Sequence, residues 1–346
     1  MEGEEKIMIV STEGDYGDSV FTLGILSELP GGPHTLLLKP SGMTKMRPNG
    51  GGFENFDKVF GPLARSQPYI ADCRPIRPDD KIDWPAELFR SVPYRGTTLF
   101  NAHLCHLISH AKVGHGITGL NKWLFGIKPS KESEGRIVIN RTARYRNWTF
   151  PWSAVVNKYK HRLMFVGLEH EWREFCGHFG YVDFRPTENL LQVAQLIAGS
   201  LLFIGNQSCA NAVAEGLKHR LIQETDLQFP DCLFKRDNAQ HVVKGNCVLP
   251  GFDDEDTNTD PLAIKLTDID TITTPPGGWM ITTPDGEVKK HRVFSSMVAL
   301  GRLHGFTREE VVEQNIRHNY EYFFKAAHGS LYDFAENAMT NAGITR

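Results

Sequence analysis

The sequence predicts an α/β protein with two Rossmann-like domains. A short apolar run at residues 7–10, a loop rich in Gly and Asp, apolar residues at helical spacing and a second apolar run at residues 34–39 form the opening of a parallel α/β unit. The same alternation begins again near residue 136. A chain of 346 residues is also long enough for two domains.

The second half repeats the alternation of strand and helix. Apolar runs predict strands at residues 137–139, 163–166 and 201–204, while helical spacing predicts helices over residues 152–159 and 190–198. A turn sequence at Pro284-Asp285-Gly286 predicts a hairpin, and Thr307-Arg-Glu-Glu310 is a capping box that begins a C-terminal helix. We therefore expect an N-terminal domain at 1–135, a second domain at 136–290 and a helical segment at 291–346.

Composition excludes several classes of protein. Hydrophobic residues make up 40% and charged residues 23%, which is ordinary globular usage, and a net charge of −3 does not favour general binding to nucleic acid. We find neither an apolar run long enough to cross a membrane nor a secretory signal, so no integral membrane association is expected. The six cysteines lack Cys-x-x-Cys spacing and are typical of reduced thiols in a cytoplasmic protein.

Gly17 and Asp18 lie between the first predicted strand and helix. The N-terminus of a helix favours an anion, and Asp18 could act there as a general base, with Asp15 as a second carboxylate of the same loop. The alternative is that Asp18 only caps the helix, since Asp is a favoured N-cap residue.

A second strand-to-helix junction carries Asn206, Gln207 and Ser208, with Asn211 in the helix that follows. Gly205 permits close approach of the backbone, so exposed N–H groups here could receive a pyrophosphate. An ordinary capped helix is the alternative. The junction is neither a Gly-x-Gly-x-x-Gly fingerprint nor a P-loop, which disfavours a dehydrogenase and a nucleoside triphosphatase.

Two further loops follow predicted strands of the second half. One carries Arg141, Arg144 and Arg146, and arginine is well suited to phosphate. The other carries Gly167 and Glu169, and a carboxylate at a strand end can accept from ribose hydroxyls. Parallel sheets bind ligands at the carboxyl ends of their strands, where both loops begin. A solvated loop and a helix start with a dipole-facing glutamate are the alternatives.

His103, Cys105, His106 and His110 have a spacing that resembles metal ligands on a helix. The spacing matches no metal motif, and we favour an acceptor-site or core role for His103 and His106. The acidic run at residues 253–260 lacks the glycine of a calcium loop and is interpreted as solvated. No metal site is expected.

Taken together, these pieces resemble the heptosyltransferase-like glycosyltransferases (glycosyltransferase family 9), which have the GT-B fold. The resemblance covers about residues 5–225. It places the family's catalytic Asp on Asp18, its donor-phosphate residue on Arg146 ahead of Trp148, and its Gly-x-Glu ribose contact on Gly167 and Glu169. The family's Asp-Ser/Thr-Gly-x-x-His helix start falls on residues 206–211, where Asn206, Ser208 and Asn211 replace Asp, Gly and His; in the first helix, Gly24 replaces Pro.

The resemblance implies two Rossmann-like domains that face each other across a cleft, followed by a C-terminal helical extension. It implies an inverting, metal-independent transfer of a sugar from a nucleotide-sugar donor to an acceptor hydroxyl, with no cofactor. The acceptor could be a glycan, a small molecule or a modified nucleobase. A GT-B sugar-nucleotide epimerase and a non-catalytic protein that binds nucleotide sugars or glycans remain alternatives.

Overall fold

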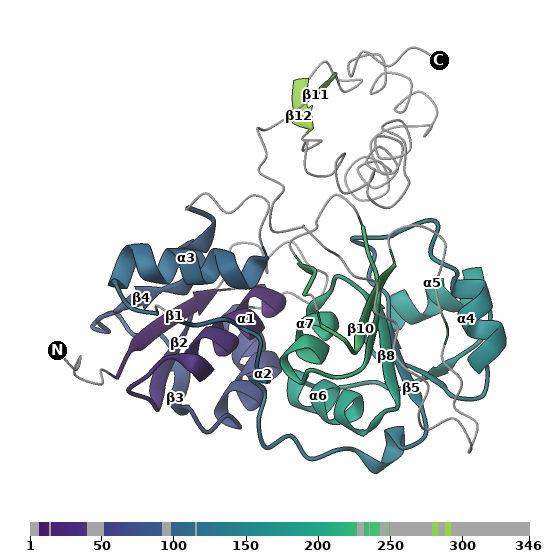
Figure 1. The fold of residues 1–346 in the computed structure, drawn as a ribbon, viewed down its shortest axis with the longest axis horizontal. Coiled ribbons are helices and arrows are strands. Elements are labelled where there is room, and N and C mark those ends of the chain that lie inside the picture. Colours follow the sequence, from purple (N-terminus) through teal and green to yellow (C-terminus); the bar gives the residue numbers. More distant parts are fainter. Residues whose placement is uncertain are drawn as a thin grey trace.

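The computed structural model of the protein contains two parallel α/β sheets, each with its own helices (Figure 1). It describes residues 7–242 apart from 14, 40–51, 92–97, 115, 227–231 and 235, together with residue 249 and two later strands. The expected C-terminal helix begins in a segment that lies outside the described residues. No helix in the described part of the chain is long and apolar enough to span a membrane.

The first sheet has the strand order β3-β2-β1-β4. Its elements are β1 (Ile9–Glu13), α1 (Tyr16–Glu28), β2 (His34–Lys39), α2 (Gly52–Arg65), β3 (Ile70–Pro75), β4 (Trp84–Pro85), the 3-10 helix η2 (Ala86–Ser91) and α3 (Leu99–Ala111). Strand β1 pairs in parallel with β2 on one side and with β4 on the other. The chain therefore changes direction in the sheet between β1 and β4, which is where such sheets form ligand sites.

The second sheet has the strand order β10-β9-β8-β5-β6-β7, and its pairings are parallel. Its elements are the 3-10 helix η3 (Lys131–Ser133), β5 (Ile137–Asn140), α4 (Trp152–Tyr159), β6 (Leu163–Phe165), α5 (Glu169–Phe179), β7 (Asp183–Phe184), α6 (Leu190–Gly199), β8 (Leu202–Asn206), α7 (Cys209–Gly216), β9 (Leu221–Glu224) and β10 (Ala239–Val242). The change of direction in this sheet lies between β5 and β8.

Alternation along the strands divides the second sheet between two cores. Ile137 and Ile139 belong to one apolar cluster with α4 and α5, whereas Val138 belongs to a cluster with α6 and α7. Successive side chains of a strand point to opposite faces, so both faces of the sheet are covered. The continuous apolar run that predicted β5 is the signature of such a strand.

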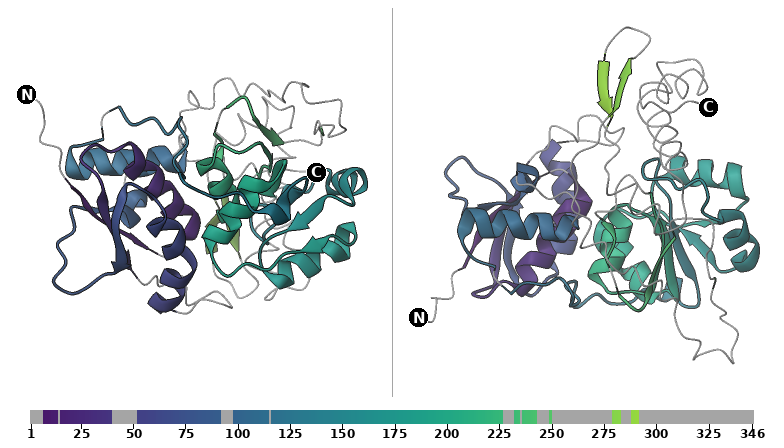
Figure 2. Two further views of the ribbon diagram at one scale, coloured as in Figure 1. Left: turned by 90° about the horizontal axis from the view of Figure 1, so that it is seen from below. Right: turned by 45° about the horizontal axis from the view of Figure 1, so that its top comes forward.

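The two halves share one of these cores. The cluster that contains Val138 continues into the first half through residues of α1 and α2, so α1 and α2 pack against α7 and α6 between the two sheets (Figures 1 and 2). Helix α1 also packs closely against α3 and Trp123 at Gly24. A Cβ at this position would lie 2.8 Å from Cε2 of Phe100 and 3.1 Å from Cδ2 of Trp123. The proline of the resembling family is thus replaced at a crowded position.

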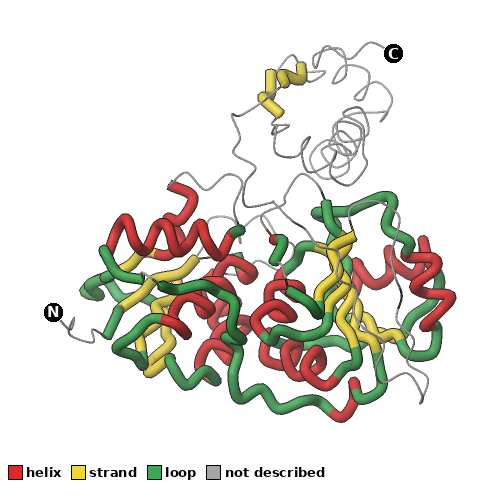
Figure 3. Tube along the Cα trace, in the orientation of Figure 1, coloured by secondary structure: helices red, strands yellow, loops and turns green. Residues whose placement is uncertain are grey.

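The structure confirms the predicted α/β class and most second-half elements (Figure 3). Strand β1 begins two residues later than the apolar run suggested. Helix α2 and strand β3 lie in a stretch rich in Gly, Pro and polar residues, for which the sequence predicted no regular element. The predicted hairpin is present as β11 (Trp279–Thr282) and β12 (Val288–His291), which pair antiparallel. The domain boundaries at residues 135 and 290 remain predictions.

Candidate functional site

The candidate site lies where the N-termini of α1 and α7 meet. A methyl group added at Gly17 in the first turn of α1 would lie 3.7 Å from Cα of Cys209, the first residue of α7. Helix α1 follows β1 and α7 follows β8, so both helices begin at the direction changes of their sheets. Two helix N-termini bring their partial positive charge to one place, which favours an anion.

Asp18 is the carboxylate at this junction. It occupies the third position of α1, and Asp15 takes the N-cap position instead. The N-cap interpretation of Asp18 is therefore wrong. The Asp18 side chain is 12% exposed, and its Oδ2 accepts a 2.9 Å hydrogen bond from Arg90 Nη1.

Burial raises the pKa of the Asp18 carboxyl above its ordinary value, while the charge of Arg90 opposes the rise. The charge of Asp15 raises this pKa further and that of Arg144 lowers it. Arg144 belongs to the second half of the chain, so Asp18 responds to charges from both halves. A carboxylate whose pKa lies above the usual range is a stronger base, as proton abstraction from a hydroxyl requires.

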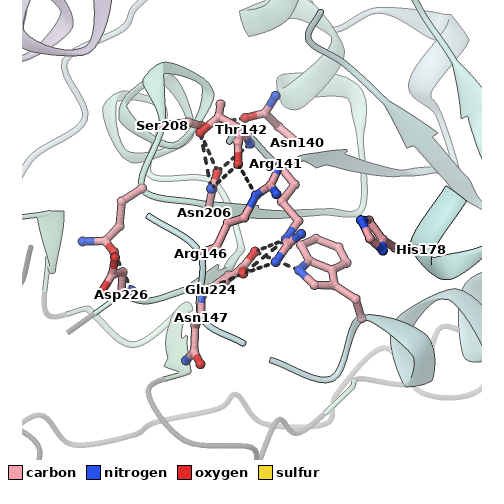
Figure 4. A network of polar contacts seen from close by, with 12 residues as sticks. Asn140, Arg141, Thr142, Arg146, Asn147, His178, Asn206, Ser208, Glu224 and Asp226 are labelled. Carbon is pink, nitrogen blue, oxygen red and sulfur yellow. Dashed lines mark hydrogen bonds and ion pairs between the residues drawn. The ribbon is translucent and has the colours of Figure 1, made fainter. Parts of the chain in front are cut away.

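The loop after β5 is held across the carboxyl edge of the second sheet by a polar network (Figure 4). Glu224, at the end of β9, is fully buried and accepts hydrogen bonds from Arg141 Nε at 2.9 Å and Nη2 at 3.0 Å. The same carboxylate accepts from Asn147 N at 2.9 Å and from Trp152 Nε1 at 2.8 Å. Arg141 is thus committed to Glu224, and its contribution is to fix this loop.

Asn206 anchors the same loop from β8. Its Oδ1 accepts from the backbone N–H of Thr142 at 3.1 Å, and its Nδ2 donates to the carbonyls of Thr142 and Arg144. Asn206 both accepts from this loop and donates to it, so an amide suits this buried position, whereas an ionised carboxylate could only accept. The structure therefore gives a physical reason for the departure at Asn206.

Replacing Asn206 by Asp should lower the stability of the protein by about 1–3 kcal/mol, because a carboxylate cannot donate to the two carbonyls. Urea unfolding at neutral pH measures the effect. Asn121→Asp, on an exposed residue, is the matched control and should change little. An Asn206→Asp variant as stable as the parent would show that these bonds do not hold the loop.

Other predicted donor residues lie along the same edge. Ser208 Oγ donates to Asn140 Oδ1 at 2.7 Å, and Gln207 Oε1 accepts from the backbone of Asp226 at 2.7 Å. A Cβ at Gly167, whose φ is +142°, would lie 2.7 Å from Asn140 Nδ2, so a side chain there would collide with the side chain of Asn140 at the end of β5. Asn211 is buried in α7, and its Oδ1 has no hydrogen-bond partner in the described residues.

Arg146 and Glu169 are already engaged with other side chains. Arg146 is 8% exposed, donates to both carboxylate oxygens of Glu174 at 2.7 Å, and holds the pKa of Glu174 below its ordinary value. Glu169 is the first residue of α5 and pairs on the surface with Arg173 at 2.5 Å. A donor phosphate at Arg146 would have to share its guanidinium with Glu174. Sequence reasoning missed Glu174 because no motif marks it.

The two histidines lie in the first half, beneath η2. His103 is 1% exposed and stacks on Phe89 with a ring-centroid distance of 3.9 Å, while His106 Nδ1 accepts from Trp84 Nε1 at 3.0 Å. Burial lowers the pKa of both imidazoles, that of His103 well below its ordinary value. These contacts match the core interpretation. Within the described ranges, no group of three or more His, Cys, Asp or Glu could hold a metal ion.

No protein-family model and no curated protein matches this sequence. Several solved structures are similar to this one in the path of the backbone. Escherichia coli heptosyltransferase WaaC with ADP-2-deoxy-2-fluoro heptose is 12% identical with a TM-score of 0.47, covering 68% of this chain and 93% of its own. E. coli ADP-heptose lps heptosyltransferase II is 11% identical with a TM-score of 0.47, covering 68% and 90%.

A glycosyl transferase family 9 protein from Veillonella parvula is 13% identical with a TM-score of 0.44, covering 64% of this chain and 81% of its own. These identities are too low to transfer the role of any residue, and the scores do not decide the function. The roles considered below therefore depend on the contacts of this chain itself.

Proposed function

We propose that this protein is a glycosyltransferase of the GT-B type that moves a sugar from a nucleotide-sugar donor to an acceptor hydroxyl. The observation that carries this proposal is the position of Asp18. A buried carboxylate with a raised pKa stands at the N-terminus of α1, directly against the N-terminus of α7. A proton acceptor and an anion-binding helix end are thus neighbours, which is the arrangement that acid–base attack on a phosphorylated sugar needs.

In the proposed reaction, Asp18 takes the proton of the acceptor hydroxyl while that oxygen attacks the anomeric carbon of the donor. The bond from this carbon to the diphosphate oxygen breaks, and the nucleoside diphosphate leaves with the bonding electrons. In-line attack from the opposite face inverts the anomeric configuration. The partial positive charge at the N-terminus of α7, with the nearby charges of Arg144 and Arg146, would compensate the negative charge on the leaving group.

The donor site is proposed at the carboxyl ends of β5 and β8, where the strand order reverses and α/β sheets bind ligands. Gln207, Ser208 and Asn211 line the start of α7, and Gly167 and Glu169 follow the neighbouring strand β6. A glycan, small-molecule or modified-nucleobase acceptor would approach from the side of the first sheet. Asp15, Gly17 and helix α3, which carries His103 and His106, belong to that side.

A thermal-shift screen tests the donor site. We expect one of ADP, GDP, UDP, CMP or their sugar conjugates to raise the unfolding midpoint by several degrees, since ligand at about 100 times Kd stabilises a protein by about 2.7 kcal/mol. Arg146→Met should lose this stabilisation by the nucleotide, whereas Arg185→Met, which removes an exposed arginine paired with Glu132, should retain it.

The outcomes of the screen separate the candidate functions. Absence of a shift with every nucleotide would contradict the donor site. A shift without transfer to any acceptor would favour a binding protein, and release of nucleoside diphosphate in water alone would favour an epimerase. Stabilisation by NAD(P)H alone would favour an oxidoreductase.

A further inference from the structure

Arg90 contacts the carboxylate that the proposed reaction uses as its base. Strands β1 and β4 are parallel neighbours, with Val10 opposite Trp84 and Ser11 opposite Pro85. Helix α1 follows β1, and η2 follows β4, so the topology places the two following segments side by side. Asp18 of α1 and Arg90 of η2 meet there with Nη1 and Oδ2 2.9 Å apart.

Aromatic stacking supports the guanidinium of Arg90. Its Cζ lies 4.2 Å from the ring centroid of Phe89, and the ring of Phe89 stacks on that of His103 from α3 with an interplanar angle of 22°. Arginine stacks well on aromatic faces, and a buried stack restricts the rotamers of its members. Arg90 is therefore supported by a column that begins in the core, although its own side chain is 51% exposed.

Only one oxygen of the Asp18 carboxylate is used by this pair. Among the described residues, the carboxylate accepts its hydrogen bond from Arg90 at Oδ2, whereas the Thr22 hydroxyl donates to the backbone oxygen of Asp18. Oδ1 consequently remains for a hydroxyl proton. A base fixed through one oxygen presents the other in a defined direction, which is what orientation requires.

We infer that Arg90 is a positioning residue that holds Asp18 through Oδ2 and keeps Oδ1 for the acceptor hydroxyl. The inference rests on the proposed role of Asp18 as the base. Arg90 also favours the ionised form of the buried carboxylate: burial favours the neutral acid, whereas the charge of Arg90, with that of Arg144, favours the anion. The negative charge of Asp15 acts on the same carboxylate in the opposite sense, because it favours the neutral acid.

The test is a titration of Asp18 followed by ¹³C NMR in the full chain with labelled aspartate, assigned with an Asp18→Asn variant. Removal of Arg90 in Arg90→Met should move the titration midpoint of Asp18 to higher pH by about one pH unit, because a neighbouring opposite charge shifts an aspartate by about 1–3 units. Arg90→Lys keeps the charge and should restore much of the midpoint. Arg185→Met is the matched control and should leave the midpoint unchanged.

A second measurement reports on orientation. With a turnover assay, Arg90→Met should lower kcat about tenfold or more with little change in donor KM, and the acidic limb of the pH profile should move upward with the NMR midpoint. An unchanged midpoint in a folded Arg90→Met variant would overturn the inference. If no donor is turned over by the parent protein, the proposed function fails, yet the NMR midpoint still decides whether Arg90 holds Asp18.

Discussion

Asp18→Asn should reduce sugar transfer by at least about 10²-fold, the lower end of what a positioned general base contributes. Asparagine has nearly the shape of aspartate, and its carbonyl can still accept from Arg90, but it cannot take the proton of an acceptor hydroxyl. Nucleotide binding should survive, since the proposed donor contacts lie on α7 and on the loops after β5 and β6.

The unfolding midpoint of Asp18→Asn distinguishes a catalytic role of Asp18 from a purely structural one. The pKa of Asp18 is raised in the folded protein, so the stability linked to this group is present at low pH and is lost as pH rises through the folded-state value. Ionisation of the buried carboxylate therefore carries a net cost that its neighbours only partly offset. Asp18→Asn removes that cost, and the unfolding midpoint at pH 7 should not fall.

The measurement combines a transfer assay, nucleotide titration and thermal unfolding on the same samples. Asp183→Asn is the matched control, because Asp183 is an exposed aspartate that pairs with Arg136. It lies in β7, the edge strand of the second sheet. A fall of several degrees in the midpoint of Asp18→Asn, with transfer reduced in proportion to folded protein, would assign Asp18 a structural role. Full transfer by a folded variant would exclude it as the base.

The elements that the sequence predicted share one property: their side chains follow a simple period. Strand β5 is a continuous apolar run because both of its faces are covered, and α6 has one apolar face that packs against its sheet. Helix α2 breaks the expected pattern because it contains Pro62 and begins at Gly52. Strands β9 and β10 are buried although they carry polar residues such as Gln223 and His241, whose hydrogen bond at 2.8 Å exists only after pairing.

The candidate site was predictable in its parts but not in its pairings. Motif positions at strand ends placed Asp18 and Asn206 correctly at the carboxyl edges of the two sheets, since that placement follows from topology. The pairing of Arg146 with Glu174, and of Arg90 with Asp18, depends on how separate segments pack. Glu224 was missed because β9 was not predicted as a buried strand; had it been, a glutamate at its end would have indicated a cationic partner, since a buried carboxylate requires a cation.

Loss of the Glu224 carboxylate should have the largest effect on stability of any single change considered. Glu224 is 0% and Arg141 5% exposed, and the carboxylate receives donors from Arg141, Asn147 and Trp152. Glu224→Ala leaves the Arg141 guanidinium buried without its anion and two further donors unsatisfied. Removal of one partner of a buried pair costs about 3–5 kcal/mol, so we expect unfolding to begin at much lower urea concentration.

A double-mutant cycle identifies the cause of this loss. Arg141→Met should be destabilising for the same reason, and the double variant with Arg141→Met and Glu224→Ala should lose clearly less than the sum of the single variants, because no uncompensated charge remains. Glu132→Gln, which breaks an exposed pair with Arg185, should cost at most about 1 kcal/mol. Additive losses in the cycle would show that the two side chains act independently. Non-additive losses would show that Arg141 and Glu224 stabilise the protein as a pair, the pair that joins the loop after β5 to the end of β9.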